Sequence, residues 1–210
     1  MVYDLTHLIR ENIQVWPGTP GPQISTLFTV ENNGFMETGL NLVSHTGTHM
    51  DAPAHMIKNG LTLDRIPVNH FIGLAVKIDL THCCRLIQAE DIERLLQLDF
   101  LFNWVLLHTG WSRYWGHQAY FGPYPVLTEK GAYLLSKFPL KGIGIDAPSF
   151  DAFDSKDYPN HHLLLGKNIL FVENLRGLEP LPTDRAFSFS ALPLHYVNAD
   201  GAPVRAMAII

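Results

Sequence analysis

Cysteine is scarce in this sequence, since only Cys83 and Cys84 occur among its 210 residues and they are adjacent. Neighbouring cysteines close a disulfide only with strain, which argues against a disulfide framework. We expect both thiols to be buried. A thiolate metal site is the alternative, but neither a second cysteine pair nor a nearby His-x-x-Cys spacing supports it.

Long apolar runs and an excess of basic residues are also missing. No stretch approaches the ~20 apolar residues of a membrane span, and residues 1–8 include an early acid rather than the apolar core of a signal peptide. Lys and Arg are scattered, and the formal net charge is −5. We therefore predict a cytoplasmic protein whose partner is a small molecule, and neither nucleic acid nor a membrane.

The signatures of two common protein classes are absent as well. The sequence has no Gly-x-Ser-x-Gly elbow of a serine hydrolase, and it has neither Gly-x-Gly-x-x-Gly nor the Walker glycine pattern of phosphate-binding loops. These absences argue against serine-based hydrolysis and against nucleotide binding.

Apolar residues make up 47% of the chain and no linker-like stretch divides it, so we predict one domain over residues 1–210. Helical spacing of apolar residues predicts one helix over residues 88–97 and another that starts after a cap at Thr128. Because predicted strands outnumber these helices, the fold class is a mixed, sheet-rich α/β domain, or an α+β one. Short runs rich in Val, Ile, Leu and Phe predict the strands, at residues 3–9, 24–30, 40–44, 74–80, 104–109, 142–146, 169–173 and 204–210.

Two long loops contain aromatic residues. Residues 14–23 include Trp16 followed by Pro-Gly-Thr-Pro-Gly-Pro, and residues 112–125 interleave five aromatic residues with Gly and Pro. Long loops in compact domains are often binding loops, and these aromatic side chains could enclose a planar substrate. A packed surface loop or a dimer contact is the alternative.

A histidine-rich motif contains His45, His49, Asp51 and His55 within eleven residues. Imidazole and carboxylate ligands suit divalent ions such as zinc and manganese. Thr-Gly-Thr after His45 disfavours a helix, and the odd numbering directs all four side chains to one face of an extended segment. Because Pro53 interrupts any strand, we expect a strand end that runs into a coiled loop around an ion. The first three residues would bind the ion, and His55 would be a fourth ligand or a free base; hydrogen-bonded histidines on a polar strand are the alternative.

Catalytic centres with two metals often take a bridging carboxylate from elsewhere in the chain. Glu173 is the best candidate, because it ends the apolar run at residues 169–172, where an unpaired buried carboxylate would be costly. A cationic group should therefore meet it. His161 and His162 lie just upstream on a predicted turn and could supply an imidazole, although each alone is more often an ordinary surface or core histidine.

The histidine-aspartate motif resembles the signature of the cyclase-like metal-dependent hydrolase family, which includes bacterial kynurenine formamidases and isatin hydrolases. The resemblance covers nearly the whole chain and implies a swivelling β/β/α fold, a homodimer or larger homo-oligomer, and a centre with one or two zinc or manganese ions. It extends to Trp-Pro-Gly at 16–18, Leu-His-Thr-Gly-Trp at 107–111, Gly-Ile-Asp-Ala-Pro-Ser at 144–149, Glu-Asn-Leu at 173–175 and Gly-Ala-Pro-Val-Arg at 201–205.

The metal ligands that the resemblance implies are His45, His49, Asp51, His161 and Glu173. The first three would bind one ion, and Asp51 with the last two would bind another, so that Asp51 and Glu173 are shared. His161 is preferred to His162 because it stands twelve residues before Glu173, as the family's ligand does.

The resemblance also implies that His55 is the catalytic acid/base and that Trp16 contacts an aromatic substrate. Two positions depart from the formamidase pattern. Thr19 follows Gly18 where the family usually has Asp, and His108 stands where Arg is expected before Thr-Gly. These departures leave the metal centre intact but weaken the assignment of a substrate.

The implied reaction is hydrolysis of an aryl amide, N-formylkynurenine to kynurenine and formate, by a water molecule that the metal activates. Hydrolysis of a cyclic amide or a lactone is the alternative within the family. A metal-binding domain without catalytic activity is the alternative of another class, but closed structural sites have four protein ligands, whereas a free His55 favours an open site.

Overall fold

The computed structural model describes residues 1–83, 85–183 and 185–210. Cys84 lies outside these residues, so the predicted burial of its thiol concerns a part of the chain that is not described. Cys83 is half-buried at the margin of the core, which is less than the predicted burial. Among the helices in the described part of the chain, none is long and apolar enough to cross a membrane.

The main sheet has the strand order β1-β12-β11-β5-β7-β9-β10-β4. Its strands are β1 (Val2–Asp4), β4 (His49–Asp51), β5 (Ile72–Asp79), β7 (Trp104–His108), β9 (Gly142–Ile145), β10 (Leu170–Glu173), β11 (Phe187–Pro193) and β12 (Gly201–Ile209). The strands β5, β7, β9 and β10 run parallel to one another, and the remaining pairings are antiparallel. Because β4 also pairs with the start of β12, the sheet closes into a barrel-like core.

The central strands are apolar along their whole length because both faces of the sheet are covered. Every residue of β7, β9 and β10 is buried. Alternate residues belong to two clusters: Val105 and Leu107 pack toward the helices, and Trp104 and Leu106 pack inside the closed sheet. The ends of β4 and β10 therefore sit on a rigid, well-packed base.

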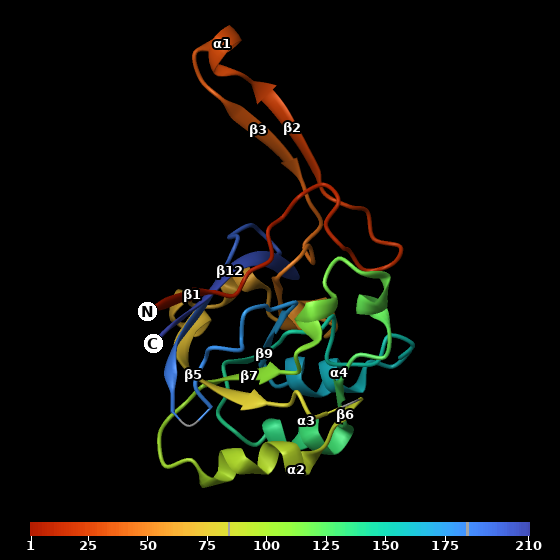
Figure 1. The fold of residues 1–210 in the computed structure, drawn as a ribbon, viewed down its shortest axis with the longest axis vertical. Helices are drawn as coiled ribbons and strands as arrows, with labels where there is room; N and C mark the ends of the chain where they lie inside the picture. The colour runs from red at the N-terminus through yellow and green to blue at the C-terminus, as the bar shows by residue number, and fades with distance from the viewer. Residues whose placement is uncertain (84, 184) are drawn as a thin grey trace.

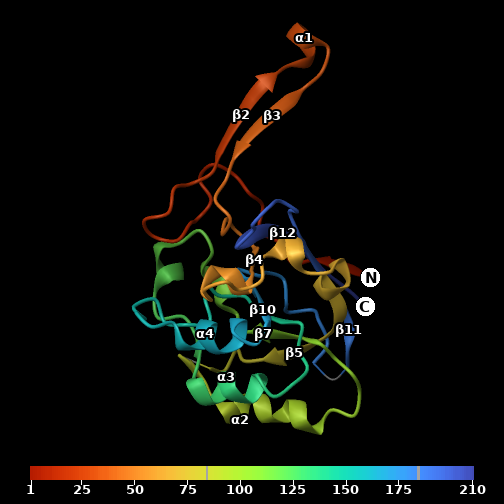
Figure 2. The same ribbon diagram turned by 180° about the vertical axis from the view of Figure 1, so that it is seen from behind.

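Three helices lie together on one side of this sheet (Figures 1 and 2). The predicted helix over residues 88–97 is α2 (Ala89–Ile92), continued as a 3₁₀ turn over Glu93–Gln97. The prediction of a Thr128 cap is confirmed, because its side chain accepts a hydrogen bond from the Gly131 N–H at the start of α3 (Glu129–Leu135). The third helix is α4 (Pro159–Leu165).

The prediction of a turn at His161 and His162 is wrong, since both residues lie in α4. Pro159 occupies the first turn of this helix, where its fixed φ favours a helical start. The leucines at the end of α4 pack onto the sheet.

All eight predicted strands overlap observed ones, with shifted ends. The first predicted run ends at Asp4 rather than residue 9, and β11 was not predicted although apolar and polar residues alternate in Phe-Ser-Phe-Ser-Ala. Two short strands, β6 (Leu86–Ile87) and β8 (Val126–Leu127), pair beside the helices. The remaining 3₁₀ helices are Pro53–His55, Leu63–Arg65, Val68–Phe71, Trp111–Tyr114 and Gln118–Phe121.

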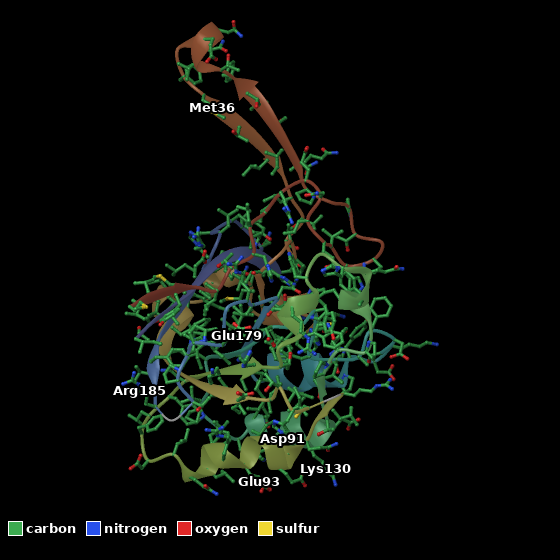
Figure 3. The ribbon with its side chains drawn as sticks, in the orientation of Figure 1. Met36, Asp91, Glu93, Lys130, Glu179 and Arg185 are labelled. Atoms are coloured by element: carbon green, nitrogen blue, oxygen red, sulfur yellow. The ribbon has the colours of Figure 1, made fainter. Side chains whose placement is uncertain are left out.

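A hairpin that we call the arm, residues 23–41, projects from the body of the molecule (Figures 1 and 2). It consists of β2 (Gln23–Phe28), α1 (Val30–Asn33) and β3 (Glu37–Asn41), and its two strands form a sheet of their own. Met36 lies near its far end (Figure 3). The arm exposes large apolar side chains, namely Leu27, Phe28, Val30, Phe35, Met36 and Leu40.

Candidate metal centre

Strand pairing brings the motif next to Glu173. β4 lies between β10 and the start of β12, with His49 directly opposite Glu173. Residues that face each other across antiparallel strands point to the same side of the sheet. His49 Nε2 lies 3.6 Å from Glu173 Oε2, and 3.2 Å from Oδ1 of Asp51, two residues further along β4. The predicted strand that runs into a loop is confirmed, since a 3₁₀ turn with Pro53 follows β4.

His45 reaches the same place from a turn that precedes β4. Gly47 in this turn has a φ of 64°, a backbone conformation that favours glycine, and its carbonyl accepts a hydrogen bond from the Asn174 side chain. The neighbouring Thr48 hydroxyl donates to the Asn174 carbonyl. With the turn fixed in this way, His45 Nδ1 lies 2.8 Å from Asp51 Oδ1.

His161 joins the cluster from α4. Its Nε2 is 3.5 Å from Glu173 Oε1 and 3.9 Å from Asp51 Oδ2, whereas His162 is exposed. Asp151 holds the other side of this ring, because its Oδ2 lies 2.6 Å from His161 Nδ1 and also accepts the His161 backbone N–H. Asp151 was missed by the sequence reasoning, since its role depends on a helix that the sequence did not predict.

The five residues form two sets of ligand atoms, each within 4.8 Å of one another. One set is His45, His49 and Asp51, and the other is Asp51, His161 and Glu173. Both sets combine imidazole and carboxylate donors, which suit zinc and manganese. Glu173 Oε1 is buried and makes no hydrogen bond within the described residues, so it offers a lone pair to an ion. The arrangement therefore fits one or two divalent cations.

The charges of the cluster depend on one another. Burial alone would lower the pKa of His45, but the carboxylates of Asp51 and Asp200 raise it to about 10. Burial likewise opposes the charge of His161, and the carboxylates of Asp151 and Glu173 raise its pKa to about 10. His45 and His49 hold the pKa of the buried Asp51 well below its usual range, although burial acts in the opposite direction. Protons thus provide the positive charge that the carboxylates require.

His55 stands beside this cluster rather than inside either set. It ends the 3₁₀ turn after β4, and its ring centroid is 4.0 Å from that of His45. Its Nδ1 lies 3.6 Å from Oδ2 of Asp200, a residue that the sequence reasoning missed. The family resemblance extends only to Gly-Ala-Pro-Val-Arg at 201–205, which begins one residue after Asp200. His55 is half-buried, so a substrate can reach it.

A cavity of about 300 Å³ opens directly over the cluster. The loop at residues 14–23 contributes Trp16 and Thr19 to its wall, and the loop at 112–125 contributes Trp115 and Phe121. The predicted binding role of both loops is supported by this placement, although Tyr120 and Tyr124 are buried as packing residues. Of the two residues that depart from the formamidase pattern, Thr19 lies in the cavity wall and His108 does not.

Comparison with known proteins gives a consistent result. Residues 3–152 match the model of the family described as "Putative cyclase". The kynurenine formamidase of Geobacillus thermodenitrificans (strain NG80-2) is 33% identical over 209 residues, which cover 97% of this chain and 94% of that protein.

Solved structures agree with these relatives. A "potential metal-dependent hydrolase with cyclase activity" superposes with a TM-score of 0.82 at 30% identity, covering 99% of this chain and 96% of that one. An isatin hydrolase bound to the product analogue thioisatinate superposes with a TM-score of 0.85 at 28% identity, covering 100% and 92%. The predicted sheet-rich α/β fold of this family is confirmed.

Proposed function

Since the chain belongs to the cyclase family of metal-dependent hydrolases, we propose that it is an arylformamidase that hydrolyses N-formylkynurenine to kynurenine and formate. The observation that supports this most is the convergence of His45, His49, Asp51, His161 and Glu173 beneath a cavity with aromatic walls. The kynurenine formamidase relatives, which align over nearly the full length of this chain, support the substrate.

The proposed cofactor is one or two divalent ions, zinc or manganese. His45, His49 and Asp51 would hold one ion, and His161 and Glu173 together with Asp51 would hold the other. Divalent ions in such a site supply Lewis acidity, which lowers the pKa of water toward ~7 and polarises a carbonyl group. The buried carboxylates contribute the negative charge that attracts a cation into this part of the protein.

His55 is the proposed acid/base. Its Nδ1 faces Asp200, which leaves Nε2 to accept a proton from the attacking water. An arylamine is a poor leaving group unless it is protonated, so the same Nε2 then delivers the proton to the departing nitrogen. Trp16 packs edge-on to Phe121 in the cavity wall, where it would hold the aromatic ring of the substrate.

A cyclic amide such as isatin is the second candidate substrate. The superposition with an isatin hydrolase and the departure at Thr19, which lies in the cavity wall, favour it. A non-catalytic metal-binding domain would need a closed ligand shell. The open cavity above the cluster argues against that alternative.

We also propose a homodimer or larger homo-oligomer. The arm exposes a run of large apolar side chains, with Met36 at 67% and Leu40 at 63% of full exposure. Apolar surface concentrated on a projecting hairpin is typical of an interaction site, and a second copy of the chain would bury it. The cytoplasmic location stays a prediction.

The test measures release of kynurenine from N-formylkynurenine by the metal-free protein and after reconstitution with zinc or with manganese. We expect metal-dependent turnover with kcat/KM above ~10⁴ M⁻¹s⁻¹. Isatin is assayed in parallel; turnover of isatin alone would replace the formamidase assignment with the second candidate. A loaded protein that hydrolyses neither substrate would contradict both.

His55→Ala separates its proposed role from metal binding. Loss of the acid/base should lower kcat by roughly 10²–10⁴-fold while the metal content stays that of the unchanged protein. If metal content fell in proportion to activity, His55 would be a ligand and the proposed proton transfer would be wrong.

A further inference from the structure

Asp200 lies just before β12 and contacts two histidines of the site. Its Oδ2 is 3.0 Å from Nε2 of His45 and 3.6 Å from Nδ1 of His55. Asp200 belongs to neither ligand set that contains Asp51, although its carboxylate lies within 4.8 Å of ligand atoms of His45 and His55. One carboxylate thus lies between a proposed metal ligand and the proposed acid/base.

The two nitrogens of His45 face different carboxylates. Nδ1 lies 2.8 Å from Asp51, a member of both ligand sets, and Nε2 lies 3.0 Å from Asp200. A histidine that binds a metal through one nitrogen carries its proton on the other, and a carboxylate that accepts this proton fixes both the tautomer and the ring orientation.

We infer that Asp200 is a positioning residue of the metal centre: it accepts the Nε2–H of His45 and so presents the Nδ1 lone pair to the ion. This inference rests on the proposed metal site. The same carboxylate orients the His55 ring, so that Nε2 of His55 is the nitrogen left for proton transfer. Asp200 therefore couples the placement of a ligand to the placement of the acid/base.

The backbone around Asp200 is built for this contact. The Asp200 carbonyl accepts a hydrogen bond of 2.9 Å from the Ala52 N–H, and the next residue, Gly201, pairs with Asp51 across β12 and β4. A Cβ at Gly201 would lie 2.6 Å from Cε1 and 2.9 Å from Nε2 of His45. The imidazole ring therefore rests on bare backbone beside its carboxylate partner, and a larger residue at position 201 would push it away.

The test compares Asp200→Ala and Asp200→Asn with the unchanged protein. Zinc affinity is measured by competition with a chromophoric chelator, starting from metal-free protein. We expect Asp200→Ala to bind zinc 10–100-fold more weakly, as is typical when the hydrogen-bond partner of a metal-binding histidine is lost. Asp200→Asn should recover most of this loss, because its amide oxygen can accept the Nε2–H. The stoichiometry at saturating zinc should be unchanged in both variants.

Three controls make the result decisive. Asp99→Ala, which removes an exposed carboxylate outside both the ligand groups and the cavity wall, should leave zinc affinity unchanged. The melting temperature of each metal-free variant reports whether the fold is intact, and the near-isosteric Asp200→Asn provides a folded variant if Asp200→Ala is unstable. Failure of the unchanged protein to bind zinc would contradict the proposed function rather than this inference.

Two results would overturn the inference. One is a zinc affinity of Asp200→Ala within twofold of the unchanged protein, which would mean that Asp200 does not orient His45. The other is the loss of a whole zinc equivalent at saturation, which would make Asp200 a ligand itself.

Discussion

The arm and the metal cluster are neighbours in sequence, but their side chains are distributed in opposite ways. In the arm, apolar residues such as Phe35 and Met36 are exposed; in the cluster, polar residues such as Asp51 and Glu173 are buried. Each pattern inverts what an isolated folded chain prefers. The difference agrees with the two proposals that an apolar surface covers the arm and that a cation occupies the cluster.

The two regions also differ in how they are held together. The arm depends on pairing between β2 and β3, which are close in sequence. The cluster depends on β4, β10 and α4, which are distant in sequence and fixed by the closed sheet. Yet both ends of the arm are close in sequence to residues of the site: the loop with Trp16 ends at residue 23, and residue 41 precedes His45 by four positions.

The largest effect is expected from breaking the cluster at the residue that both ligand sets share. Asp51→Asn removes one negative charge and one shared ligand, so metal content should fall and activity should drop by at least roughly 10³-fold. Elemental analysis of the dialysed protein and an activity assay at saturating metal measure the two effects. Thr62→Ala, outside the cluster, is the control.

The same variant separates two descriptions of the cluster. If the buried carboxylates served only as partners of histidines, Asp51→Asn would alter stability without altering metal content. Full metal content in a folded Asp51→Asn protein would contradict the proposed ligand sets. Asp51→Asn should not affect the arm, so the oligomeric state of this variant should match that of the unchanged protein.

A smaller effect is expected from the arm. Phe35→Ser with Met36→Ser removes two exposed apolar side chains at its far end, which should weaken self-association by roughly tenfold or more. Sedimentation equilibrium measures this change. Metal content should stay constant, and activity should fall only a few-fold, through a less ordered loop at Trp16.

Leu101→Ser is the matched control for the arm, because Leu101 is 87% exposed on the body of the molecule. If any loss of exposed apolar surface weakened self-association, the Leu101 variant and the arm variant would be weakened equally. Equal association of the arm variant and the unchanged protein would mean that the arm is not the contact between copies.

The cluster was predictable from the sequence, because His45, His49 and Asp51 combine two types of metal-binding side chain at a spacing that few other functions need. Glu173 was predictable from the cost of a carboxylate at the end of an apolar strand. Asp151 and Asp200 were not, because each acts by meeting a histidine that tertiary structure brings to it. The predicted strands at residues 24–30 and 40–44 overlap β2 and β3, but the projection of the arm was not predicted, since the composition of a strand does not reveal whether it packs on the body.

The smallest effect concerns the pH dependence of stability. It shows whether protons or a metal ion balance the charge of the buried carboxylates in the cluster. In the metal-free protein the pKa values of His45 and His161 are raised to about 10, above the ~6.5 of an unfolded histidine. Groups with a raised pKa stabilise the folded state fully below pH ~6.5, and this stabilisation is lost as the pH rises through about 10. Metal binding requires neutral imidazoles, so stabilisation by metal should instead increase over the same range.

Urea unfolding at pH 6.5, 8 and 9.5 should therefore give a midpoint that falls with rising pH in the absence of zinc. The difference between the midpoints with and without zinc should widen over the same range. Asp51→Asn isolates the cluster from other groups that titrate in this range, because it removes a carboxylate that raises the pKa of His45. The metal-free variant should lose less stability with rising pH than the unchanged protein, whereas the arm variant should lose as much. If the stability of the metal-free unchanged protein and of metal-free Asp51→Asn fell equally with rising pH, protons on the histidines would not balance the charge of the carboxylates. The contrast between the two regions would then rest on the arm alone.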